Sequence, residues 1–509
     1  MFDIDDIPMN DIHIWDMICE GKVKGCFQIE SRLGRTWCKK VKPRCIEELS
    51  AVIALIRPGA LKGSIDGKTI ANHYADRRDG KDEVKIIHES ISEVLKETYG
   101  VFIYQEQILK VAQIMSKFDA KETLKLQKGI GKKDSKVINE LMERFVSGAV
   151  SNGITKEVAE DVFSAIQKSG RYLFNKSHSV QYAIECYQSA YLRRYYVLFF
   201  FKNWLKFSGD KVEPDVEVKQ LIASAKAESI VVNGPSIKYL QENFFIKGDE
   251  IYFGICSVKN VGAAHLQKMK TLNLDKIDNW NEMLFFALPN VNSRAVKCLI
   301  EVGAFSFLGM PRTRMLHEFK CMEDIKDGEL KWLCDNYHPN MSLVKHLELL
   351  ARKKKDGGGC HTITRVDKVI EIIKKIENPG RNLSDSPITY ASLEENLLGV
   401  AISHSHLTAC ADACHANTTC LEINEGKISK STIATIIKEV KVHKTKKDEN
   451  MCFLTVEDET GELENIVVFP AVFAAHSDII YQDSTVLLTG EISTKNNSRS
   501  FIVESVYQI

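Results

Sequence analysis

The chain has 509 residues, of which 68 are Lys or Arg and 68 are Asp or Glu, so its formal net charge is zero. At about 150 residues per domain, this length predicts three or four domains with sizeable cores. A hydrophobic share of 44% and a charged share of 27% are ordinary for globular proteins and exclude disordered or collagen-like chains. The apolar run at 195–201 is too short to span a membrane, and the scattered cysteines favour a reducing cytoplasm. With zero net charge, any nucleic-acid contact must come from local basic clusters.

The first half of the chain predicts mainly helices. Residues 1–45 mix short apolar stretches with glycines and a proline, which indicates turns and short helices. A helix that begins at Ile46 must end near Arg57, because Pro58 disfavours helical geometry in the residue before it. Apolar spacing predicts further helices at 100–116, 135–151, 155–169 and 180–207.

In the second half, the helical pattern is interrupted at residues 233–235, which read Asn-Gly-Pro. Residues 244–246 and 251–255 predict a β-hairpin around Gly248 and Asp249, and helices resume at 262–308. The triplet Gly357-Gly358-Gly359 predicts a flexible joint. Five alternating segments then predict a small closed barrel of the OB type, with a helix at 471–477 between the third and fourth: 433–442, 451–456, 464–469, 485–492 and 500–506.

The sharpest basic cluster lies between Lys121 and Lys136. Its Gly-Ile-Gly-Lys-Lys segment at 129–133 is typical of a phosphate-binding turn, because glycines let backbone N–H groups approach an anion. It is not a Walker loop, since Leu126 stands where a glycine is required and Lys133 replaces Ser or Thr. The alternative is a lysine-rich solvated helix face.

A second cluster starts at residues 174–179, which read FNKSHS, and continues through Tyr182, Tyr187 and Tyr191 to Arg193 and Arg194. Aromatic rings suit nucleic-acid bases and cations suit phosphates. Core packing of the tyrosines is the alternative.

Three other motifs are weaker. Asp3 and Asp5 could share a face and hold metal ions, although an ordinary acidic start explains them better. His404, His406, Cys410, Cys414, His415 and Cys420 lack the C-x₂-C spacing of a zinc site, so buried thiols on a helix are preferred. The segment Lys259-Asn260-Val261-Gly262 could present backbone N–H groups to a phosphate, as helix-hairpin-helix modules do.

Several strings in a shared order resemble one family, the bacterial DNA polymerase III α subunits, or family C DNA polymerases. Residues 25–31 read GCFQIES and resemble its GxFQxES segment, and residues 57–59 resemble its RPGP segment, with Ala60 in place of the second proline. Residues 104–107 match YQEQ, 131–133 match GKK and 174–179 match FNKSHS. Leu398, Gly399 and Ser403 resemble a later LGxxxSxHPL segment, and residues 445–447, 453–458 and 468–469 resemble the family's OB domain.

The resemblance implies a multidomain α+β fold, with largely α-helical fingers and a helix-hairpin-helix region followed by a C-terminal five-stranded OB-fold β-barrel. The implied parts are a segment that follows the palm at 1–45, fingers at 46–210, a helix-hairpin-helix and clamp-proximal domain at 211–330, a helical connector at 331–428 and the OB-fold domain at 429–509. The palm with its catalytic aspartates would lie outside this similarity.

The resemblance also implies site residues. Those expected to face the incoming nucleotide are Lys128, Lys132, Lys133, Asn175, Lys176, His178 and Arg57. Those expected to contact DNA are Lys125, Tyr182, Arg193, Lys259, Asn260, Gly262, Lys444, Lys446, Lys447 and Phe453. Two departures weaken the match: Gln127-Lys128 stands where the family has two cations, and Leu173 replaces a glycine.

The expected function is that of the C-terminal part of a split replicative polymerase, inactive alone. It would bind dNTP and primer–template DNA and complete synthesis with a palm-bearing polypeptide that holds most of the Mg²⁺. The expected location is the cytoplasm of a bacterium, or of one infected by a phage. A sliding clamp is a further candidate partner, although 330–400 holds no convincing Q-x-x-L-F-like motif. The alternatives are a catalytically inactive DNA-binding or polymerase-regulating homologue and, ranked last, an enzyme with its own metal site at Asp3 and Asp5.

Overall fold

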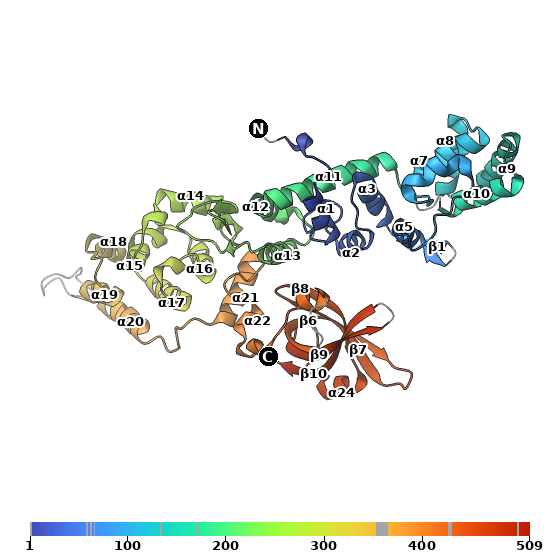
Figure 1. Ribbon diagram of the computed structural model, residues 1–509. Helices are drawn as coiled ribbons and strands as arrows, with labels where there is room; N and C mark the ends of the chain where they lie inside the picture. Colours follow the sequence, from blue (N-terminus) through green and yellow to red (C-terminus); the bar gives the residue numbers. More distant parts are fainter. Residues whose placement is uncertain are drawn as a thin grey trace. The chain divides into compact units, whose positions relative to one another are not determined.

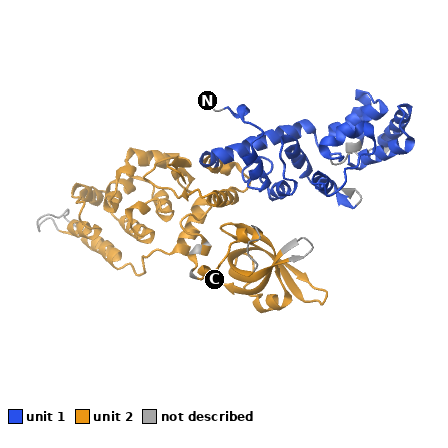
Figure 2. Cartoon of the chain, in the orientation of Figure 1, with its two compact units in different colours: residues 1–200 blue, residues 201–509 orange. Residues whose placement is uncertain are grey.

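The structure is a computed structural model, and it describes residues 3–57, 60–61, 64–65, 67–132, 135–169, 173–352, 365–425, 430–495 and 498–509. The chain divides into two compact units, Met1–Phe200 and Phe201–Ile509 (Figure 2). The predicted joint at 357–359 lies outside the described residues.

The first unit contains two hydrophobic cores. One is built by α1 (Ile12–Cys19), α2 (Arg32–Val41), α3 (Ile46–Leu55), α5 (Ile70–Arg78) and α11 (Lys176–Tyr195), with α3 lying against α11 (Figure 1). As the sequence predicts, α3 ends just before Arg57. A short hairpin of β1 (Ser64–Ile65) and β2 (Lys68–Thr69) precedes α5.

The second core of this unit lies among α6 (Ser92–Leu95), α7 (Gln105–Ser116), α8 (Ala120–Lys132), α9 (Ser135–Ser151) and α10 (Lys156–Ser169). The predicted helices at 135–151 and 155–169 are confirmed. The one predicted at 100–116 begins only at Gln105, because the residues before it are extended. The side-chain oxygen of Gln107 accepts hydrogen bonds from the backbone N–H groups of Ile103 (2.9 Å) and Tyr104 (3.0 Å) and so holds this start in place.

The long helix predicted at 180–207 is also corrected. It begins at Lys176, because the Asn175 side chain accepts a hydrogen bond from the His178 N–H and caps the helix. It ends at Tyr195, because Tyr196 leaves helical geometry with φ −127° and ψ 42°, and α12 (Val197–Phe207) follows.

The second unit opens with α13 (Pro214–Ala227) and a three-stranded sheet. The predicted hairpin is confirmed as β4 (Phe245–Lys247) and β5 (Glu250–Tyr252), and β3 (Val232–Asn233) pairs in parallel with β5. The remaining helices are α14 (Ala263–Thr271), α15 (Trp280–Glu282), α16 (Ser293–Glu301), α17 (Arg312–Met322), α18 (Asp327–Asp335), α19 (Leu343–Ala351), α20 (Val366–Glu377), α21 (Pro387–Leu398), α22 (His406–Ala409) and α23 (Cys420–Glu425).

A closed five-stranded barrel ends the chain, with strand order β10-β8-β7-β6-β9. Its strands are β6 (Lys430–Lys444), β7 (Asn450–Asp458), β8 (Gly461–Val468), β9 (Thr485–Lys495) and β10 (Ser498–Gln508), with α24 (Pro470–His476) between β8 and β9. The parallel pairing of β10 with β8 closes the barrel. Gly490 in β9 allows the close approach of β10, because a Cβ there would lie 2.1 Å from the carbonyl oxygen of Ile502.

The fold is therefore α+β, with a helical fingers region and a five-stranded barrel of the OB type, as the sequence predicts. The boundaries of the five predicted domains stay predictions. No helix in the described ranges has both the length and the apolar character needed to cross a lipid bilayer.

Candidate nucleotide and nucleic-acid site

Two of the recognised motifs lie side by side in the first unit. Tyr104 and Phe174 form a parallel β-bridge, in which the Phe174 N–H donates to the Ile103 carbonyl and the Gln105 N–H donates to the Phe174 carbonyl, both at 2.9 Å. The YQEQ and FNKSHS segments, 70 residues apart, therefore start their helices from the same point.

The N-terminus of α11 holds a carboxylate. The backbone N–H of Lys176 donates to Glu106 Oε2 at 2.9 Å, and the Asn175 amide donates to Glu106 Oε1 at 2.8 Å. Free N–H groups and the helix dipole make such an end a site for anions. Here an anion of the chain itself occupies it.

The side chain of Lys176 is engaged in the same way. Its ammonium group lies 2.6 and 2.8 Å from the two carboxylate oxygens of Glu97 and 5.8 Å from the centre of the Tyr104 ring. About a third of each charged side chain is exposed, so the pair is accessible to solvent.

Arg57 joins this group through an aromatic ring. Its guanidinium carbon lies 3.9 Å from the centre of the Phe174 ring, a cation–π contact. His178 lies 5.4 Å from the same ring and 3.9 Å from that of Tyr182. The structure thus brings Arg57, Asn175, Lys176 and His178 together, as the resemblance implies.

Buried hydroxyl groups lie beneath the site. Ser179 Oγ donates to the Ser50 carbonyl at 2.6 Å, and Ser50 Oγ lies 2.9 Å from Ser179 Oγ and 3.1 Å from the Tyr104 hydroxyl. Burial raises the pKa of Tyr104, so this hydroxyl stays neutral and can donate. These contacts link α3, α11 and the YQEQ segment.

Fewer of the expected site residues on the basic helix α8 can be described. Lys128 is exposed, and Lys125 is exposed and pairs with Glu140 at 2.6 Å. The Gln127 amide donates to Gln105 Oε1 at 2.6 Å. Lys133 and the side chain of Lys132 lie outside the described part of the chain.

The segment at 259–262 lies in the second unit. Lys259 is exposed and lies 3.5 Å from Asp215, and its backbone N–H donates to the Leu397 carbonyl. Asn260 is exposed with φ 71°, and the Gly262 N–H donates to His265 Nδ1 at 3.1 Å, so this N–H already has a partner at the start of α14. Contact of this turn with DNA stays a prediction.

On the barrel, the expected DNA-binding residues lie on β6, β7 and the loop between them. Lys446 and Lys447 are exposed, and Lys444 pairs with Asp448 at 2.7 Å. Phe453 is 37% exposed and packs edge-on against His443 at 5.3 Å. A half-exposed ring beside lysines fits single-stranded nucleic acid.

One expected role, that of Arg193, and the alternative of a metal site at Asp3 and Asp5 are not supported by the geometry. Arg193 is only 2% exposed and donates a hydrogen bond to the Lys24 carbonyl, so the structure corrects its expected place on the surface. Asp3 and Asp5 do not fit a two-metal site, because the Asp3 carboxylate caps a short turn by accepting the Asp5 N–H. Within the described residues, no three His, Cys, Asp or Glu side chains gather as metal ligands would.

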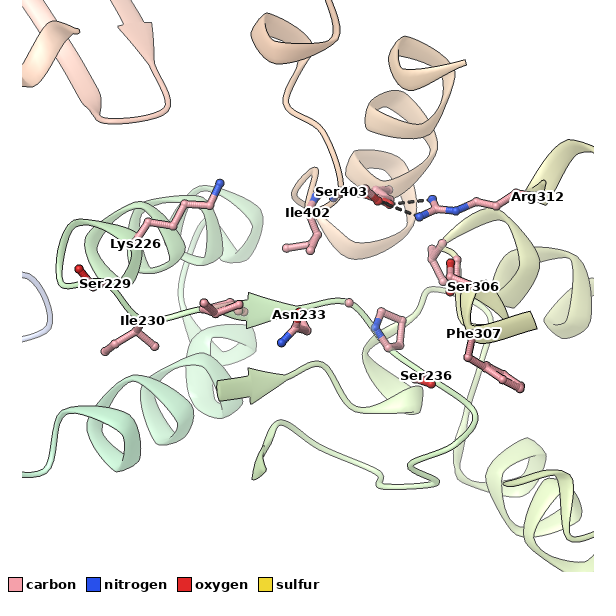
Figure 3. Close-up of a pocket in the computed structure, with 17 residues that line it drawn as sticks. Lys226, Ser229, Ile230, Asn233, Ser236, Ser306, Phe307, Arg312, Ile402 and Ser403 are labelled. Atoms are coloured by element: carbon pink, nitrogen blue, oxygen red, sulfur yellow. Dashed lines mark hydrogen bonds and ion pairs between the residues drawn. The ribbon is translucent and has the colours of Figure 1, made fainter. Parts of the chain in front are cut away.

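A cavity of about 650 Å³ in the second unit was not expected from the sequence (Figure 3). In its wall Arg312 pairs with Glu394 at 2.7 Å and donates to Ser403 Oγ at 2.7 Å. Glu394, with its side chain 1% exposed, also accepts the N–H groups of Ile402 (2.7 Å) and Ser403 (2.8 Å). The one sequence signal was Ser403 in the LGxxxSxHPL-like segment. None of the expected nucleotide-binding residues lines this cavity.

Comparison with known proteins gives a consistent result. Residues 1–153 match the family described as the bacterial DNA polymerase III alpha subunit finger domain. The DNA polymerase III subunit alpha of Aquifex aeolicus is 29% identical over 99% of this chain and 39% of that protein. Those of Bacillus subtilis and Staphylococcus aureus strain MSSA476 are each 26% identical, over 98% and 99% of this chain and 42% and 43% of their own lengths.

The chain therefore spans about two-fifths of the length of the curated relatives it matches. The part that matches the finger domain contains the motifs at 25–31, 104–107 and 131–133. The resemblance is confirmed: over nearly its whole length, this chain is similar to bacterial DNA polymerase III α subunits, and its residues 1–153 match their finger domain.

Proposed function

We propose that this chain binds incoming dNTP and primer–template DNA as part of a replicative DNA polymerase, and that a palm-bearing polypeptide supplies the metal-binding carboxylates. The observation that carries the proposal is the meeting of Arg57, Asn175, Lys176 and His178 at the N-terminus of α11. Guanidinium, ammonium and helix N–H groups are the partners that a triphosphate needs.

In this proposal the chain's residues position the nucleotide. Lys176 and the α11 N–H groups would neutralise phosphate oxygens after they displace Glu97 and Glu106, and His178 with Tyr182 would offer a surface to the sugar or base. Mg²⁺ supplies charge neutralisation at the reacting phosphates, and it would be held mainly by the palm. The barrel would hold single-stranded template through Phe453 and the lysines of the β6–β7 loop. Clamp binding stays a prediction.

The test is primer extension with three samples: the chain alone, the chain with a palm-bearing polymerase polypeptide, and that mixture with Lys176→Ala. Synthesis should appear only in the mixture and should fall at least about tenfold with Lys176→Ala, since an ionic contact to phosphate is lost. Lys168→Ala, an exposed lysine at the end of α10, is the matched control and should leave synthesis unchanged. Synthesis by the chain alone would overturn the shared active site.

A second candidate is a catalytically inactive homologue that binds DNA or regulates a polymerase. Gln127 favours it, because it places a neutral amide, bonded to Gln105, where the family has a cation. Leu173 packs against the α7–α10 core where the family has a glycine. No synthesis with any palm-bearing partner, together with retained DNA binding, would select this candidate.

A further inference from the structure

Helix α2 carries a basic face that the recognised motifs do not include. From Ser31 to Cys45 the sequence contains six cations and no carboxylate: Arg32, Arg35, Lys39, Lys40, Lys42 and Arg44. All six are exposed. Arg32, Arg35 and Lys39 recur at positions that share one side of a helix.

The other side of α2 is firmly packed. Trp37, Cys38 and Val41 are buried in the core that α1, α3 and α5 share. Gly34 lies against the preceding loop so closely that a Cβ there would be 2.5 Å from the Ile29 carbonyl oxygen. The basic face is therefore held in a fixed orientation outward.

The lysines of this face are available to bind an external anion. Lys39, Lys40 and Lys42 form no ion pair with any described residue. Lys40 donates to the neutral Asn72 side chain at 2.5 Å and lies 5.0 Å from the Trp37 ring, whereas Arg44 is already paired with Asp16 at 2.5 Å.

Lys42 also occupies an unusual backbone position. It ends α2 in the left-handed region, with φ 52° and ψ 61°, where glycine is the ordinary residue. A side chain there strains the backbone. A lysine at this position keeps a cation next to Lys39 and Lys40 at the expense of local stability.

We propose that the α2 face, Arg32, Arg35, Lys39, Lys40 and Lys42, binds the phosphate backbone of DNA without reading bases. This rests on the proposed function only in naming DNA as the partner. A helix of this length spans about 15 Å, enough for several phosphates of one strand. Leu33 is the large apolar side chain that α2 exposes, so the face lacks the aromatic anchors typical of a protein interface.

The test uses the full chain without nucleotide or partner. Fluorescence anisotropy with a labelled duplex, and separately with one of its single strands, gives Kd from about 50 to 200 mM salt. The variant Lys39→Gln/Lys40→Gln/Lys42→Gly should bind more weakly and lower the slope of log Kd against log salt by about 0.9 per lost contact on duplex, or about 0.7 on single strand. Lys42→Gly alone should not lower the denaturation midpoint, because glycine relieves the strained backbone.

The chain offers a matched control in Lys85→Gln/Lys96→Gln/Lys117→Gly. These lysines are exposed, and Lys117 also ends its helix, α7, in the left-handed region with φ 53°. The control removes the same charge and relieves the same strain, yet should leave the salt slope unchanged. An equal loss in both variants, an unchanged slope in the α2 variant, or no DNA binding by the wild-type chain would each overturn the proposal. Because no synthesis is measured, these outcomes are independent of primer extension.

Discussion

The ammonium group of Lys176 lies 2.6 Å from a carboxylate oxygen of Glu97, a residue 79 positions earlier in the chain. Glu106 occupies the N–H groups at the start of the same helix. The Lys176 ammonium group and the N-terminus of α11 therefore already hold anions of the chain itself. A nucleotide bound as proposed would have to compete with Glu97 and Glu106, so these carboxylates would limit its affinity.

Replacing Glu97 with Gln removes this competitor, and we expect triphosphate affinity to rise. A partly exposed ion pair contributes about 0.2–1 kcal/mol, which corresponds to about 1.5- to 5-fold in Kd. Calorimetric titration of the chain with dNTP and Mg²⁺ measures this change in Kd. Glu93→Gln removes an equal charge from the neighbouring exposed pair with Lys96, 3.5 Å long, and should have no effect. Weaker binding by Glu97→Gln would show that Glu97 supports the site instead.

Gln107 is 2% exposed, and its amide makes hydrogen bonds to Ile103, Tyr104, Val94 and Thr98. Gln107→Leu leaves two backbone N–H groups without this acceptor, so we expect a loss of at least about 2 kcal/mol of stability. Chemical denaturation measures the loss. Gln113→Leu on the exposed side of the same helix should change stability by less than about 0.5 kcal/mol. Equal effects of the two variants would contradict this role.

Glu394, which pairs with Arg312, and its neighbour Glu395 should differ strongly in their contribution to stability. Glu394→Gln leaves the guanidinium without its charge partner, at an expected cost of about 3–5 kcal/mol. Amide exchange at Ile402 and Ser403, which donate to Glu394, should also accelerate. The next residue, Glu395, forms a partly exposed pair with Lys219, and Glu395→Gln should cost about 0–1 kcal/mol. Similar costs for both would rule out the stabilising role of Glu394.

The lowered pKa of Glu48 should make the stability of the folded chain depend on pH. Burial acts to raise its pKa, but hydrogen bonds from Arg78, from the Arg44 N–H and from the Tyr99 hydroxyl outweigh it and hold the pKa below the ordinary value of 4.5. The unfolded chain therefore binds this proton first as pH falls. The stabilisation is complete above pH 4.5 and is lost as pH falls through the lowered pKa.

The variant Glu48→Gln should consequently be less stable than the wild type above pH 4.5, with a difference that shrinks below it. Denaturation midpoints measured across this range test the sign. Glu47→Gln changes an exposed neighbour and should follow the wild-type curve. A difference that grows with acidity would contradict the assignment.

The barrel could be predicted from the sequence because its signals are local. Alternation of apolar and polar residues marks each strand, as in β7, where Cys452, Leu454 and Val456 face the core. Turn residues such as Thr460 and Gly461 mark the ends. The short β3 strand was missed because a strand of two residues carries no alternation, and only its pairing with β5 defines it.

Errors arose where distant residues decide the conformation. Residues 101–104 have apolar side chains that suit a helix, yet α7 begins only after them. The Gln107 side chain accepts the N–H groups of Ile103 and Tyr104, and the Phe174 N–H donates to the Ile103 carbonyl. The candidate site was predicted residue by residue through motifs. Its carboxylates, Glu97 and Glu106, could not be, since nothing in their local sequence indicates which cations they contact.

The bridge between Tyr104 and Phe174 brings together two points of the first unit that are 70 residues apart in the chain. The helical segment from 105 to 169 begins and ends next to this bridge, and it supplies most of a core that Ile91, Leu95 and Phe102 complete. We call such a segment a cassette. Because its two ends lie close together, a short linker could replace it, or a different segment could be inserted in its place. In the proposed nucleotide site, the cations of α8 would come from the cassette and Lys176 from outside it, so the bridge would join the two parts of that site.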